Sequence, residues 1–98
     1  MANYSKLDAR GKQIVESTEK AALLLINNEI AKARAKHPDW PDEVLEATAI
    51  ICEESGEALR EALQMHQGEH HKHEDLRKEI IQTAAVCIRW LSESDYGE

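Results

Sequence analysis

The chain has no phenylalanine, only two cysteines and only two prolines, and its basic residues form no long cluster. Nineteen acidic residues outnumber twelve lysines and arginines, which gives a formal net charge of -7. A protein that binds duplex nucleic acid normally presents a basic face, so we expect no nucleic-acid partner. The longest uninterrupted apolar run, residues 21–26, is too short to span a bilayer, and the N-terminus carries no apolar signal segment. We therefore expect a cytoplasmic protein without a membrane partner.

Strand signals are also missing, because β-branched residues do not alternate with polar ones. Breaks occur at only two places: a segment with Pro38 and Pro41, and the polar stretch 67–73, which contains Gly68. We expect three helices, at about residues 12–36, 42–66 and 74–93, with residues 1–11 as a loosely packed lead-in. A chain of 98 residues is expected to form one domain, here an all-α, three-helix antiparallel bundle spanning 1–98.

The first expected helix contains the run Ala-Ala-Leu-Leu-Leu-Ile at residues 21–26. Six consecutive apolar residues surround a helix on all sides, and a helix that is apolar all round is buried all round. Two neighbouring helices can cover only part of that surface. We therefore expect the chain to assemble as a homodimer or homotetramer.

Three acidic residues, Glu53, Glu54 and Glu57, lie within little more than one turn of the second expected helix. One interpretation is that they belong to the solvated face of an amphipathic helix. However, like charges at this spacing repel one another, and the repulsion grows when the carboxylates are partly buried. A bound divalent cation would offset it.

Glu79 is unusual on the third expected helix because Leu76, Val86 and Trp90 surround it along the same stripe. A carboxylate in an apolar stripe is costly unless it meets a cation, so either an ion pair with another helix or a metal ion would explain it. Gln82 lies on the same side, where its amide oxygen could share a ligand. These hard oxygen ligands favour Mg²⁺ or Mn²⁺ over Zn²⁺.

Together, Glu53-Glu54-Ser55-Gly56-Glu57 and Glu79-Ile80-Ile81-Gln82 resemble the signature of the all-α nucleoside triphosphate pyrophosphohydrolases, the MazG-like family. That family carries Glu-Glu-x-x-Glu on one helix and Glu-x-x-Asp on the next. His37-Pro38-Asp39-Trp40-Pro41 and residues 84–91 extend the resemblance to small, phage-type members, over most of residues 25–92.

The resemblance implies a hydrolase that converts nucleoside triphosphates, NTP or dNTP, to the monophosphate and pyrophosphate with Mg²⁺ or Mn²⁺. Glu53, Glu54 and Glu57 would be both catalytic residues and metal ligands. Glu79 and Gln82 would complete the set of metal ligands. Gln82 stands where the family usually has Asp, which removes one negative charge. The substrate would be held by a second group of residues: Asn27, Asn28, Trp40, Lys36, Lys78 and Arg89.

A different class of function also fits the sequence. A non-catalytic helical module, either a nucleotide or metal sensor or an oligomeric adaptor, could keep the acids for structure, and Gln82 favours this alternative. The histidines His66, His70, His71 and His73 match no zinc motif, and we expect them to form a solvated loop.

Overall fold

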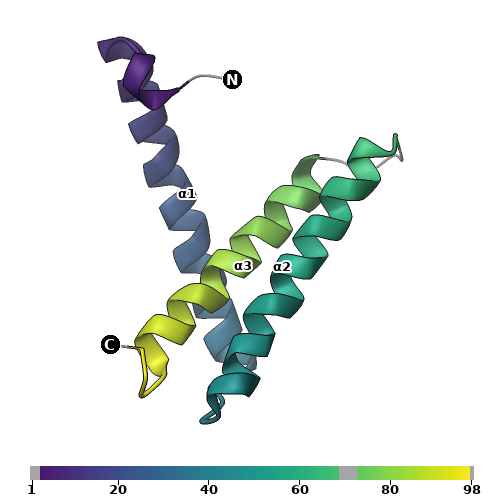
Figure 1. Ribbon diagram of the computed structural model, residues 1–98. Helices are drawn as coiled ribbons and strands as arrows, with labels where there is room; N and C mark the ends of the chain where they lie inside the picture. The colour runs from purple at the N-terminus through teal and green to yellow at the C-terminus, as the bar shows by residue number, and fades with distance from the viewer. Residues whose placement is uncertain (1–2, 69–72, 98) are drawn as a thin grey trace.

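The computed structural model describes residues 3–68 and 73–97, and over these residues it is all-helical, with three long helices and no strand. A short 3₁₀ turn, η1 (Tyr4–Lys6), precedes α1 (Ala9–Lys36), α2 (Val44–His66) and α3 (His73–Glu93). The helix α3 packs against both α1 and α2, and it runs antiparallel to α2 (Figure 1). The N-terminal half of α1 extends away from the other two helices.

The helix ends follow local signals, and some differ from the sequence-based expectation. The helix α1 begins at Ala9, three residues earlier than expected, because the Asp8 carboxylate caps it by accepting a hydrogen bond from the Gly11 amide at 2.8 Å. It ends at Lys36, before the residue that precedes Pro38.

The helix α2 begins at Val44, two residues later than expected, and neither Asp39 nor Asp42 caps it. The N-cap is Glu43, and its side chain makes no capping bond. At the other end, Gly68 follows the C-cap with φ +80°, the left-handed conformation that glycine adopts readily and that commonly terminates helices.

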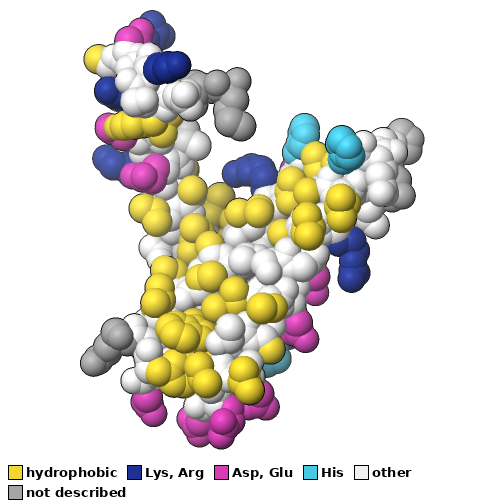
Figure 2. Space-filling model, viewed as in Figure 1, with side chains coloured by type: hydrophobic (Ala, Val, Ile, Leu, Met, Phe, Trp, Pro, Cys, Tyr) yellow, Lys and Arg dark blue, Asp and Glu magenta, His cyan; other side chains and the backbone are white. Residues whose placement is uncertain are grey.

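The core of the single chain is small. Among residues 3–68 and 73–97, the buried apolar residues are one isoleucine and three alanines: Ile30, Ala47, Ala58 and Ala85. Alanines let helices approach closely, but they bury little apolar area. Large apolar side chains remain exposed on all three helices, among them Leu24, which is 65% exposed, and Leu59, which is 60% exposed (Figure 2).

Both cysteines have free thiols, and Cys52 is exposed whereas Cys87 is partly buried. No helix within the described residues is both long enough and apolar enough to cross a membrane.

Polar contacts around Arg89, which is only 4% exposed, join the end of α3 to the end of α1 and to the connection between α1 and α2. Its guanidinium donates from two nitrogens to the two carboxylate oxygens of Glu93, at 2.7 and 2.9 Å, and Arg34 of α1 pairs with the same carboxylate at 3.0 Å. The guanidinium also lies over the Trp40 ring, 5.0 Å from its centroid. Trp40 Nε1 donates to Ser94 Oγ at 2.7 Å. These contacts fix the connection between α1 and α2 against the end of α3.

Candidate functional site

Three acidic side chains from two helices converge: Glu54 and Glu57 of α2 and Glu79 of α3. One carboxylate oxygen of each lies within 4.8 Å of the others. The convergence follows from the antiparallel packing, which places the middle of α2 beside the first half of α3. Glu54 and Glu79 are partly buried, whereas Glu57 is exposed. An open face of this kind leaves room for water or a ligand beside the three carboxylates.

Two oxygens of this cluster are buried without a hydrogen-bond partner, namely Glu54 Oε2 and Glu79 Oε2. Among the residues described, no lysine, arginine or histidine forms an ion pair with either glutamate, so the ion-pair explanation for Glu79 finds no partner here. Buried carboxylate oxygens normally accept hydrogen bonds or bind cations. The three residues therefore form a donor set of hard oxygens that could hold a divalent cation such as Mg²⁺.

The protonation equilibria reflect this crowding. Burial, and then the charges of Glu57, Glu53 and Glu29, raise the pKa of Glu54. Burial likewise raises the pKa of Glu79, together with a hydrogen bond to Glu57 and the nearby carboxylates, and Lys78 opposes part of this increase. Both shifts mean that the folded protein disfavours the charged carboxylates when no cation is bound.

We expect the stability of the metal-free protein to fall as the pH rises through the folded-state pKa values of Glu54 and Glu79. Each pKa is raised above the ordinary value of 4.5. Protonation of these two carboxyls therefore stabilises the folded state. This contribution is complete below the ordinary pKa and is lost as the pH rises through the folded-state pKa. Melting temperatures measured between about pH 5 and about pH 8 in a chelator would show this fall.

The matched variant for this measurement is Glu54→Gln, which keeps the shape of the side chain and cannot ionise. Its melting temperature should fall less between the same two pH values. If the melting temperatures of the wild type and the variant fall equally with pH, the proposed repulsion among these carboxylates is contradicted. Glu93 does not interfere, because its hydrogen bond to Arg89 lowers its pKa, so its contribution is lost only below the range measured.

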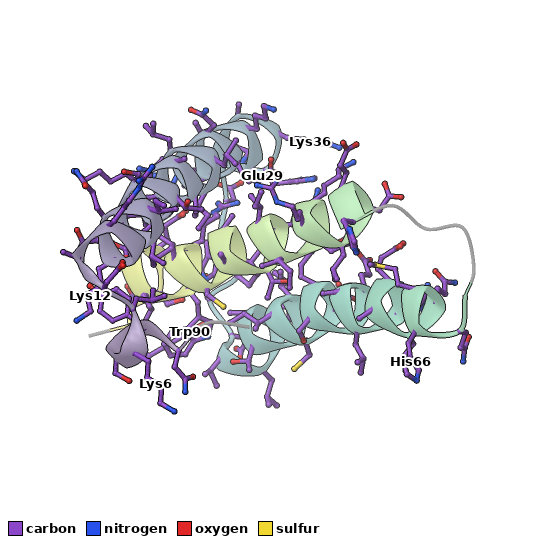
Figure 3. The ribbon with its side chains drawn as sticks, turned by 90° about the horizontal axis from the view of Figure 1, so that it is seen from above. Lys6, Lys12, Glu29, Lys36, His66 and Trp90 are labelled. Carbon is purple, nitrogen blue, oxygen red and sulfur yellow. The ribbon has the colours of Figure 1, made fainter. Side chains whose placement is uncertain are left out.

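The other residues predicted for the metal site lie beside the cluster. Glu53 is exposed and is not among the three convergent carboxylates, although its charge raises the pKa of Glu54. Gln82 is partly buried and lines a neighbouring cavity together with Glu54. Sequence reasoning missed Glu29 of α1, which also lines that cavity and faces α3 (Figure 3).

The cavity beside the acids has a volume of about 610 Å³ and is walled by all three helices and the connection between α1 and α2. Glu54 and Gln82 lie toward one end, whereas Trp40 and Arg89 lie toward the other. Along α3, seven residues separate Gln82 from Arg89, a rise of about 10 Å. The cavity can therefore place an aromatic wall roughly 10 Å from the acidic cluster.

The predicted substrate-binding residues are divided by this geometry. Trp40, Lys36 and Arg89 line the larger cavity, whereas Lys78 lines a smaller one of about 220 Å³ between α1 and α3. Asn27 and Asn28 are exposed and line neither cavity. Arg89 is not the solvated surface charge that a lone arginine suggests, because it is buried against Trp40 and Glu93.

The histidine segment is described only at its two ends. His66 and His73 are exposed, in line with a solvated interpretation, whereas His70 and His71 lie outside the described residues.

Compared with protein-family models, curated proteins and solved structures, the chain matches none of them.

Proposed function

We propose that this protein is a MazG-like, metal-dependent nucleotide pyrophosphohydrolase that converts a nucleoside triphosphate to the monophosphate and pyrophosphate. The observation that carries the proposal is the convergence of Glu54, Glu57 and Glu79, with two carboxylate oxygens buried and unpartnered. Glu54 also lines a cavity whose wall includes the Trp40 ring. The resemblance of the two acidic motifs to the family signature supports the same assignment.

In this proposal Glu54, Glu57 and Glu79 hold Mg²⁺ or Mn²⁺, with the Gln82 amide beside them. The ion, when bound, would neutralise phosphate charge and lower the pKa of coordinated water. Without it, the three clustered carboxylates in a chain of net charge -7 would repel a triphosphate.

The reaction requires an in-line displacement at the α-phosphorus. A water oxygen forms a bond to that phosphorus, and the bond from phosphorus to the bridging oxygen breaks, so that its electron pair leaves with pyrophosphate. The water gives up a proton, which an exposed carboxylate such as Glu57 or Glu53 can accept and return to solvent. The Trp40 ring offers a stacking surface for the base.

Incubation with Mg²⁺ or Mn²⁺ and a panel of NTPs and dNTPs should release monophosphate and pyrophosphate in equal amounts. The Glu54→Gln variant should lose this release, because the substitution removes a charged ligand, whereas Glu46→Gln on the exposed face of α2 should keep it. Release that persists in Glu54→Gln would point to a contaminating enzyme.

An absence of turnover with every nucleotide, together with a melting temperature that Mg²⁺ leaves unchanged, would instead favour the non-catalytic helical module. The substitution of Asp by Gln82 is the feature on which that alternative rests.

We further propose that the three helices form a bundle completed by a second copy of the chain. The assembly would be a homodimer, or a homotetramer made of two such dimers. The chain exposes 7768 Å² in total, whereas a folded monomer of 11.1 kDa is expected to expose about 5,700 Å². The excess of about 2,000 Å² per chain falls in the range that each subunit of an obligate homodimer buries. Its radius of gyration, 15.9 Å, also exceeds the value of about 13 Å expected for a compact domain of this length.

A further inference from the structure

A second, smaller cavity adjoins the large one, between α1 and the start of α3. Its lining comes from α1 and from the first two turns of α3, and the two cavities share Glu29 and Lys32. Along α3, the residues that line the smaller cavity, 74–81, precede those that line the larger one, 82–89. Glu79 lies within the first of these stretches but lines neither cavity, because its carboxylate is close to those of Glu54 and Glu57 on α2. The acidic cluster therefore borders the larger cavity through Glu54.

The smaller cavity carries a local excess of positive charge. Lys32, Arg77 and Lys78 line it, against two acids, Glu29 and Glu74. The three cations are exposed, and within the described part of the chain none of them forms an ion pair. Exposed cations that converge on one concavity of an otherwise acidic protein are available to an anionic ligand.

We infer that this smaller cavity is a pyrophosphate subsite, in which Lys32, Arg77 and Lys78 hold the two distal phosphates of the substrate. The inference rests on the proposed function and adds the direction in which the substrate lies. The base would occupy the end with Trp40, the α-phosphate would lie beside the acidic cluster, and the β- and γ-phosphates would extend between α1 and α3. Reversing the substrate would bring the triphosphate to Trp40 and to Arg89, whose charge is already paired with Glu93.

The subsite would also stabilise the negative charge that develops on the leaving group during the reaction. The departing pyrophosphate gains negative charge when the phosphorus–oxygen bond breaks, beside a set of carboxylates. Basic side chains on the leaving-group side stabilise that charge, and an arginine can bind two phosphate oxygens at once. Arg77 and Lys78 are adjacent in sequence, so the start of α3 supplies two such donors next to Glu79.

The test measures binding of inorganic pyrophosphate, in the presence of Mg²⁺, to the full-length wild type and to Arg77→Ala, Lys78→Ala and Lys32→Ala. Calorimetry should show affinity falling about tenfold for each cation removed, as expected when a charge-assisted hydrogen bond is lost. Binding of a nucleoside monophosphate to Arg77→Ala and Lys78→Ala should stay within about twofold of wild type, since that product occupies the other cavity, which neither residue lines. Lys32 lines both cavities, so Lys32→Ala is compared for pyrophosphate alone. Lys20→Ala is the matched control, because Lys20 is exposed on α1 and lines neither cavity.

Wild-type protein that fails to bind pyrophosphate would overturn the subsite, and so would variants that keep wild-type affinity or that lose pyrophosphate and monophosphate binding equally. The proposed function is judged separately. Nucleotide turnover with pyrophosphate binding that is insensitive to these variants would remove the subsite alone. Sensitive binding without any turnover would support the subsite and remove the hydrolase.

Discussion

Replacing Glu79 by glutamine is expected to lower nucleotide turnover at least about 100-fold and, in the absence of metal, to make the protein more stable. Substitutions that only support a metal ligand already cost about 10- to 100-fold in affinity or activity, so loss of a charged ligand should cost at least as much. The gain in stability follows from the unpartnered Glu79 Oε2 and the neighbouring Glu54 and Glu57, because the variant removes one of three mutually repelling charges.

The size of that gain is limited by solvent, because the cluster is open on the side of Glu57. With screening, we expect roughly 1 kcal/mol, which corresponds to an increase in melting temperature of about 4–8 °C for a domain of this size. Calorimetry in a chelator would measure it. Addition of Mg²⁺ should raise the melting temperature of the wild type and leave that of Glu79→Gln almost unchanged.

Lower turnover together with higher metal-free stability in Glu79→Gln would distinguish the hydrolase from the non-catalytic helical module. A glutamate kept for structure would lower stability when replaced, with or without Mg²⁺. Glu46→Gln, on the exposed face of α2, provides the control, because it removes one negative charge from the same helix pair without touching the cluster. If Glu79→Gln melts at a lower temperature than the wild type in a chelator, the carboxylates do not repel one another enough to favour a bound cation.

The helices could be predicted from local signals because their breaks depend on single residues. Pro38 and Gly68 stop α1 and α2 where the sequence indicates, since proline restricts the residue before it and glycine adopts the left-handed conformation. The start of α2 is marked less clearly in the sequence, because its N-cap, Glu43, makes no side-chain capping bond. The expectation that Glu79 lies among apolar residues close to Glu54 and Glu57 agrees with the observed convergence.

The remaining parts of the site depend on tertiary geometry. One face of α1 carries Glu29, Lys32 and Lys36 at helical spacing. This pattern is visible in the sequence, but only the packing of α3 against that face shows that the three residues line a cavity. Glu53 was grouped with its neighbours because it is adjacent in sequence, yet one residue along a helix is a rotation of about 100°, which takes it out of the cluster. The pairing of Arg89 with Glu93 was readable from their spacing of four residues and was missed, whereas only the fold shows that Arg34 of α1 shares the same carboxylate.

A glutamate in place of Leu24 is expected to convert the assembly to a monomer of 11.1 kDa and to lower its melting temperature. Leu24 is 65% exposed in the single chain, and the exposed Leu23 and Leu25 flank it in the middle of α1. Covering one such side chain contributes roughly 1.5–3 kcal/mol, and each dimer would lose this contribution twice, with a buried charge added. Light scattering during size-exclusion chromatography would report the mass.

Gln13→Glu is the matched control, since it adds the same charge to an exposed position of α1 three turns away and should leave the mass unchanged. Leu24→Asn separates charge from lost apolar area, and it should weaken association less than the glutamate does. A wild-type protein that is monomeric at the concentrations used for turnover would contradict the second-copy proposal. In that case the apolar surface of α1 would have to be covered by something other than a second copy, while the prediction for Glu79 would stand, because the three carboxylates that converge all belong to one chain.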